Sequence, residues 1–179
     1  MVRQQPATII VRGQGLSLRP ALLMSVAILA LATSVGAQNP RMVWNASASV
    51  PVGLYRIEPG TPVRGDLALG KLPPKTALLA DERGYLPSSA YLLKTVAATA
   101  GDRVCRIGRY VLVSGRSVVI ASIHDRQRRA LPAWHGCNLL AHGEVFLLGT
   151  TSDSFDSRYF GPIKGDHIVG RAMPIWTLR

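Results

Sequence analysis

Histidine and cysteine are scarce in this chain of 179 residues. Its four histidines and two cysteines form neither a His-Glu-x-x-His pattern nor a Cys-x-x-Cys pair. Those spacings bring zinc ligands together, so their absence argues against a zinc centre. A glycine-rich phosphate loop is also missing. We therefore expect no metal site and no cofactor.

Acidic residues are few as well: ten Asp and Glu stand against 21 Lys and Arg, for a formal net charge of +11. The densest basic cluster is formed by Arg126, Arg128 and Arg129. A cluster of this size is usually a solvated loop, or else a contact for anionic lipid headgroups. No recognised nucleic-acid module accompanies it, so we expect no nucleic-acid partner.

The two cysteines are Cys105 and Cys137. In an oxidising compartment they can form a disulfide, which would close a loop of about 30 residues and contribute about 3 kcal/mol in the chain-entropy model. The alternative is that both are small buried apolar residues.

One long uncharged segment runs from residue 20 to 37. As a helix it would be about 27 Å long, close to the roughly 30 Å hydrocarbon core of a bilayer. Arg3, Arg12 and Arg19 precede it with no acidic residue among them. The positive-inside rule then places the N-terminus in the cytoplasm.

This segment divides the chain into a cytoplasmic stretch at 1–19, a single transmembrane anchor at 20–38 and a domain on the far side of the membrane at 39–179. The alternative is a secretory signal that is cleaved after Val35-Gly36-Ala37, whose small residues are typical of cleavage sites.

Beyond residue 39, short apolar or alternating runs separated by Gly, Pro and Asp indicate β-strands. They occupy residues 67–69, 77–80, 92–97, 110–113, 117–120, 145–148 and 168–172. A hairpin turn is expected at Ser114-Gly115. We expect a mostly β, antiparallel domain that carries a small inserted β segment at about 103–143.

Two segments carry a serine and a lysine that can act as nucleophile and base. The first is Ser47-Ala48-Ser49-Val50-Pro51, and the second places Lys94 inside the apolar run Tyr91–Val96. Burial lowers the pKa of lysine from about 10.4 and so makes it a usable base, which serine needs in order to attack. Taken alone, the serines are typical of a turn, and the lysine is typical of a strand-edge residue that reaches for water.

A third segment favours the chemical interpretation. Residues 149–162 are rich in hydroxyl groups and include two carboxylates, Asp153 and Asp156. A loop with so many hydrogen-bonding groups after an apolar strand is suited to orienting other polar side chains.

In these three segments the sequence resembles the type I signal peptidases, membrane-bound serine proteases with a Ser-Lys dyad. It is most similar to the TraF-type branch, the peptidases of conjugative plasmid transfer systems. The matching blocks, which lie between about residues 45 and 172, are Ser49-Val50-Pro51 with Gly53-Leu54-Tyr55, Tyr91-Leu92-Leu93-Lys94-Thr95-Val96 with Gly101-Asp102, and Ser154-Phe155-Asp156-Ser157-Arg158-Tyr159-Phe160-Gly161.

The sequence departs from the housekeeping enzymes of that family in two places. They carry two residues between the serine and the proline, where this chain has only Val50, and their last block opens with Gly-Asp-Asn in place of Gly149-Thr150-Thr151. Both departures are similar to the TraF-type branch. The first also leaves Ser47 as a rival nucleophile to Ser49.

The resemblance implies a role for each residue of the three blocks. Ser49 is the expected nucleophile and Lys94 the expected base, while the Ser49 N–H and the Ser47 hydroxyl are expected to bind the oxyanion. Ser154 would orient Lys94, and Asp156 would pair with Arg158 to hold the loop. In the TraF-type branch, Asp153 and Asp156 are the carboxylates that would assist a cyclising step.

The resemblance also implies a function and a location. We expect a serine endopeptidase of the bacterial inner membrane, crossing it once, with its peptidase domain in the periplasm. It would process leader peptides of exported proteins delivered at the lipid bilayer, with a pilin precursor as substrate and a linear or cyclic product. The alternatives are a general leader peptidase that uses water as acyl acceptor and a non-catalytic, membrane-tethered subunit of a transfer channel.

Overall fold

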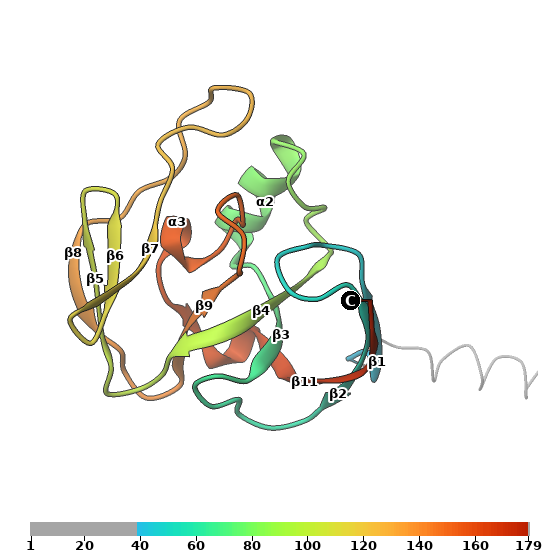
Figure 1. Cartoon of the computed structure of the whole chain (residues 1–179). Helices are drawn as coiled ribbons and strands as arrows, with labels where there is room; N and C mark the ends of the chain where they lie inside the picture. Colours follow the sequence, from blue (N-terminus) through green and yellow to red (C-terminus); the bar gives the residue numbers. More distant parts are fainter. Residues whose placement is uncertain (1–38, 179) are drawn as a thin grey trace, which may run out of the picture. The chain divides into compact units, whose positions relative to one another are not determined.

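The computed structural model describes residues 39–178 of the chain, so the predicted transmembrane anchor at 20–38 lies outside the described residues. Most of the described secondary structure is β (Figure 1). Between residues 39 and 178, no helix is long and apolar enough to cross a membrane.

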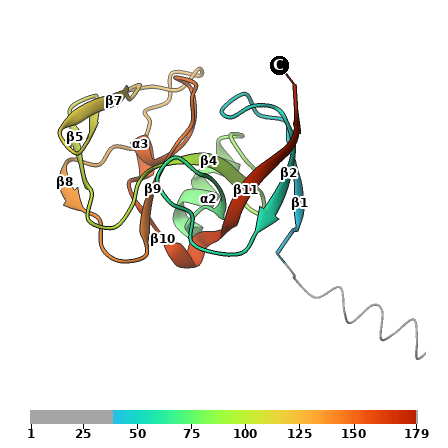
Figure 2. The ribbon, with the colours of Figure 1, turned by 60° about the horizontal axis from the view of Figure 1, so that its bottom comes forward.

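The larger sheet has seven strands in the order β1-β2-β11-β3-β4-β9-β10, and every neighbouring pair is antiparallel. Strand β11 is ten residues long and pairs first with β3 and then with β2. Figure 2 shows β11 running beside β2. The strands of this sheet are β1 (Met42–Asn45), β2 (Gly53–Glu58), β3 (Leu67–Lys71), β4 (Tyr91–Ala98), β9 (Glu144–Leu148), β10 (Ile163–Lys164) and β11 (Ile168–Thr177).

The smaller sheet has four antiparallel strands in the order β7-β6-β5-β8, and in the sequence they lie between β4 and β9. They are β5 (Arg103–Ile107), β6 (Tyr110–Val113), β7 (Arg116–Ile120) and β8 (Gly136–Leu139). Cys105 and Cys137 face each other across β5 and β8 and are joined by a disulfide. The expectation of a mostly β, antiparallel fold is therefore confirmed.

The hairpin between β6 and β7 turns at Ser114 and Gly115, as the sequence predicts. Both residues have positive φ, 49° and 80°. Two-residue hairpin turns with positive φ at both positions match the right-handed twist of the strands that they join.

The prediction of a strand at residues 77–80 is wrong, because this run lies in the helix α2 (Pro74–Glu82). Two prolines start the helix, with Pro73 at the N-cap and Pro74 at the first turn, where a missing N–H costs nothing. Ala77 and Ala80, three positions apart, are buried on the same face. Four apolar residues are too few to separate the helical period from the strand period.

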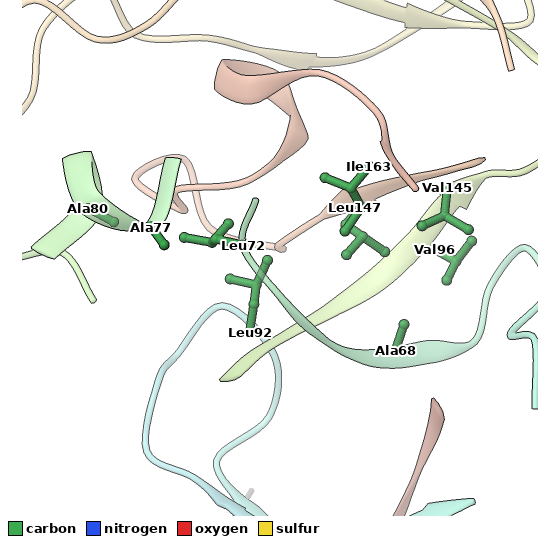
Figure 3. Close-up of a cluster of buried hydrophobic side chains, with 9 residues drawn as sticks. All are labelled: Ala68, Leu72, Ala77, Ala80, Leu92, Val96, Val145, Leu147 and Ile163. Carbon is green, nitrogen blue, oxygen red and sulfur yellow. The ribbon is translucent and has the colours of Figure 1, made fainter. Parts of the chain in front are cut away.

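Two short helices complete the fold, α3 (Ser157–Phe160) and η1 (Gly165–His167). The buried face of α2 packs on the larger sheet in one core cluster, in which Ala77 and Ala80 approach Leu72 and Leu92 (Figure 3). A second cluster joins the two sheets through Phe146 and Val111, among others. Each fully buried Leu, Val or Phe side chain contributes about 1.5 to 3 kcal/mol.

Candidate active site

Strand β4 carries Lys94 in the middle of the core. Because side chains alternate along a strand, Lys94 shares a face with Leu92 and Val96, which belong to the cluster under α2. Only 5% of Lys94 is exposed. A long cationic side chain is therefore held in apolar surroundings, away from water.

Burial lowers the pKa of the Lys94 ammonium from 10.5 to about 8. The carboxylate of Asp156 acts in the opposite direction, and the guanidinium of Arg158 acts in the same direction as burial. At slightly alkaline pH a large fraction of Lys94 is then neutral, and only a neutral amine can accept a proton.

Ser49 is the partner of Lys94. The Nζ of Lys94 lies 2.5 Å from the Oγ of Ser49, in a buried hydrogen bond that joins positions 45 residues apart. Ser49 lies in the turn between β1 and β2 and is only 5% exposed. When Lys94 is charged its nitrogen donates this bond, and when it is neutral its nitrogen can accept the hydroxyl proton of Ser49.

Ser47 lies beside Ser49 on the solvent side of the turn. The two Oγ atoms are 2.8 Å apart, and the N–H of Ser49 donates to the Oγ of Ser47 at 3.3 Å. The hydrogen bond from Lys94 reaches Ser49, which favours Ser49 over Ser47 as the nucleophile. The Ser47 hydroxyl instead lies beside the Ser49 N–H, and these are the two groups that the resemblance implies as oxyanion donors.

Thr150, for which the sequence patterns assign no role, fixes the carbonyl group of Ser49. Its N–H and its Oγ1 both donate to the Ser49 carbonyl oxygen, at 2.8 and 3.1 Å. The segment just after β9 thus orients the peptide unit of Ser49.

Gly149 allows the last block to approach the serine turn. A Cβ atom at this position would lie 2.2 Å from the Oγ of Ser154 and 3.0 Å from the Cβ of Ser49. Any side chain at Gly149 would therefore push the two segments apart. Glycine is required here because the side chains of Ser154 and Ser49 approach so closely.

Asp156 and Arg158 form a buried pair that holds this strand end in place. The guanidinium donates to both carboxylate oxygens of Asp156 at 2.8 Å, and it also donates to the carbonyl oxygen of Gly149 at 3.0 Å. Asp156 in turn accepts the N–H of Gly149 at 2.8 Å. The pair thus holds both the N–H and the carbonyl group of Gly149. Because both side chains are almost fully buried, Asp156 is out of reach of a substrate.

Ser154 is buried behind the dyad, but its hydroxyl makes no hydrogen bond to any residue between 39 and 178. The bond to Lys94 that the resemblance implies is thus not formed here. A buried hydroxyl without a partner costs about 1 to 3 kcal/mol.

A cleft of about 680 Å³ opens onto Ser49 and Lys94. Its lining includes apolar residues such as Trp44 and Leu93, together with the loop that carries Arg126. Asp153 faces this cleft and forms an ion pair with Arg126. A hydrogen bond from the Thr151 side chain holds the pKa of the Asp153 carboxyl below its usual value, so it is an accessible anion at the cleft.

No group of three or more His, Cys, Asp or Glu side chains within residues 39–178 is arranged to hold a metal ion. In chemical type, Ser49, Lys94 and Ser47 match the nucleophile, the base and the oxyanion donors that the sequence analysis expects here. This arrangement has the parts that acyl transfer requires.

Comparison with known proteins gives a consistent result. A family model described as signal peptidase, peptidase S26, matches residues 16–177. The conjugal transfer protein TraF of Agrobacterium tumefaciens (strain 15955) is 37% identical over 147 residues, which cover 74% of this chain and 81% of that protein. A plasmid transfer protein TraF of Escherichia coli is 32% identical over 168 residues, 87% of this chain and 93% of that protein.

Among solved structures, a signal peptidase I from Enterococcus faecalis V583 is 19% identical with a TM-score of 0.37, covering 63% of this chain and 97% of that chain. This structural similarity is low and adds nothing to the assignment.

Proposed function

The chain belongs to the signal peptidase S26 family, and on that premise we propose that it is a membrane-tethered serine endopeptidase in which Ser49 is the nucleophile and Lys94 the base. Family membership implies association with a membrane. The observation that carries the proposal is the buried contact of 2.5 Å between Lys94 Nζ and Ser49 Oγ, with the pKa of Lys94 lowered to about 8.

The first half of the reaction forms an acyl-enzyme. Neutral Lys94 takes the proton of Ser49 as Oγ attacks the scissile carbonyl carbon, and the carbonyl oxygen becomes an oxyanion. The N–H of Ser49 and the hydroxyl of Ser47 donate to that oxygen, which requires them to turn away from each other. The Lys94 ammonium then gives its proton to the leaving amine as the peptide bond breaks, and an ester remains on Ser49.

The second half releases the product. An acyl acceptor attacks the ester while neutral Lys94 takes the acceptor's proton. The proton then passes to Ser49 Oγ as the ester bond breaks, which restores the dyad. Loss of one oxyanion donor typically costs about 2.7 to 4 kcal/mol of transition-state stabilisation, so Ser47 is expected to matter in both halves.

The similarity to proteins named for conjugal and plasmid transfer supports a role in plasmid transfer. We propose a membrane-delivered pilin precursor as the substrate, processed in the periplasm. In this setting the acceptor is either water or the amino terminus of the same pilin, which would close the product into a ring. Asp153 is the carboxylate that can attract such an ammonium group, because it faces the cleft, whereas Asp156 is buried and fully occupied.

Mass measurement of the products tests this function. The purified full chain is incubated with candidate pilin precursors, with the Ser49→Ala variant as control. Processing that depends on Ser49 supports the peptidase, and a product lighter than the linear form by one water supports cyclisation. A linear product points to a general leader peptidase, and the absence of processing by the wild type points to a non-catalytic subunit.

A further inference from the structure

Asn45, the last residue of β1, is buried beside the serine turn, with 8% of its surface exposed. Its carboxamide makes four hydrogen bonds to the next six residues. Nδ2 donates to the carbonyl oxygens of Ser47, Val50 and Pro51 at 2.8, 3.1 and 3.0 Å, and Oδ1 accepts the N–H of Ser47 at 3.1 Å.

These bonds take the place of the backbone hydrogen bonds that a strand or helix would supply. The turn from residue 46 to 52 belongs to no strand or helix, so its backbone groups need other partners. One planar amide supplies them on both sides of Ser49. Three carbonyls share the two hydrogens of one NH2 group, a requirement that Asp, with acceptors only, cannot meet.

The rest of the turn is held by other elements. The hydroxyl of Tyr55 donates to the carbonyl oxygen of Pro51 at 2.6 Å, and Thr150 holds the carbonyl oxygen of Ser49. Asn45 holds the backbone at Ser47 through both its N–H and its carbonyl group. The place of the Ser47 hydroxyl therefore depends on Asn45.

We propose that Asn45 is a positioning residue that sets the oxyanion donors, Ser47 Oγ–H and Ser49 N–H, against the reacting carbonyl. This inference rests on the proposed peptidase function. Asn45 acts through the turn backbone, whereas β4 sets the place of Lys94 and Thr150 holds the carbonyl group of Ser49. A misplacement of about 1 Å in such a site costs about 100-fold in rate.

The test uses Asn45→Ala in the full chain, with p-nitrophenyl acetate as the probe, because attack of Ser49 on this ester creates the same oxyanion. The rate of the Ser49→Ala variant measures acetylation of other groups and is subtracted as background. We expect kcat/KM to fall about 100-fold. The rate should rise with pH about the same midpoint as in the wild type, because Lys94 remains buried.

Three further variants sharpen the result. Asn45→Asp keeps the side-chain volume and the acceptor for Ser47 N–H but loses the donors, so its loss should be of the same order even if Asn45→Ala folds poorly. Thr150→Val keeps the backbone bond to Ser49, so its loss should be only several-fold. Asn138→Ala, at an exposed asparagine of β8, is the matched control and should leave the rate unchanged.

A rate within threefold of the wild type in both Asn45 variants would overturn the positioning role. A pH limb that moves together with the loss in Asn45→Ala would also overturn it, because the defect would then lie in the dyad. If the wild type shows no turnover that depends on Ser49, the proposed function fails, and the role of Asn45 fails with it. Ser49-dependent turnover without an effect of Asn45 leaves the proposed function standing.

Discussion

The Nζ of Lys94 and the Oγ of Ser49 lie 2.5 Å apart in the interior of the domain, although 45 positions separate them in the chain. Strand β4 delivers the lysine and the turn after β1 delivers the serine. In the proposed mechanism the Ser49 hydroxyl loses a proton to Lys94, whose pKa of about 8 leaves the amine largely neutral at slightly alkaline pH.

The first prediction concerns the dyad itself. Ser49→Ala and Lys94→Ala should each abolish precursor processing while the protein remains folded and in the membrane. Lys94→Arg should be as inactive as the alanine variant, because a guanidinium stays protonated and cannot act as a base. Gel analysis of a pilin precursor incubated with each variant measures this. Activity retained by Ser49→Ala and lost by Ser47→Ala would identify Ser47 as the nucleophile instead.

The second prediction is a pH profile. Because Lys94 must be neutral to act and its pKa is lowered to about 8, the rate should rise with pH through about 8 and reach an alkaline plateau. Replacing His124, His135, His142 and His167 one at a time should leave that rise in place. A folded histidine variant that lost both the activity and the rise would indicate a Ser-His mechanism.

The third prediction links Lys94 to stability. Folding lowers its pKa from 10.5 to about 8, so between these values the unfolded chain binds the proton more tightly and wild-type stability rises with pH. Lys94→Met carries no charge to bury. It should be more stable than the wild type by up to about 3 kcal/mol below pH 8, less the value of one lost hydrogen bond.

That advantage should shrink as the pH rises from about 8 to 10.5. Thermal unfolding of the two proteins in detergent across this range measures it. An advantage that stayed constant over the whole range would mean that Lys94 is not a buried ammonium at neutral pH.

The fourth prediction concerns the buried ion pair. Asp156→Asn leaves the guanidinium of Arg158 without its carboxylate in the interior, which should cost about 3 to 5 kcal/mol of unfolding free energy. Asp166→Asn is the matched control, because Asp166 is mostly exposed, and should change stability by about 0.5 kcal/mol or less. Denaturant unfolding measures the free energy of unfolding of both variants. Equal values would show that the ion pair that holds Gly149 is dispensable for stability.

Removal of Asp156 also acts on the base. Its carboxylate raises the pKa of Lys94, and Arg158 lowers it, so any folded Asp156→Asn enzyme should have its pH limb at lower pH than the wild type. A limb at higher pH would contradict this electrostatic coupling.

The fifth prediction concerns the acyl acceptor. Asp153→Asn removes the accessible carboxylate of the cleft, so the product should shift from cyclic to linear, a gain of one water in mass. Arg126→Gln is the informative partner variant, because it frees Asp153 from its ion pair and should favour the cyclic product. Identical product ratios in both variants and the wild type would exclude Asp153 from acceptor binding.

How much of this the sequence alone could show differs between the fold and the site. The alternating runs identify most strands and the hairpin at Ser114-Gly115, because strand period and turn chemistry are local properties. The run 77–80 is the exception, because its local pattern fits both the strand and the helix period, and the prolines before it favour the helix. The three motif blocks likewise predict, without any known contact, that Ser49, Lys94 and the residues of the last block form one site.

The tertiary structure adds what the motifs leave open. The motif spacing favours Ser49 over Ser47, and the fold then brings the Ser49 hydroxyl to Lys94 on β4. Asp153 and Asp156 are two carboxylates in one loop, yet one faces the cleft and the other is buried against Arg158.

The sequence by itself determined which serine, lysine and carboxylate residues are candidates for the chemistry, and most of the strands that carry them. Both are encoded in short stretches of the chain. The pKa of Lys94, the space at Gly149 and the four bonds of Asn45 come from groups that meet only after folding. Burial and hydrogen-bond geometry depend on the register of strands far apart in the chain, and no local pattern specifies that register.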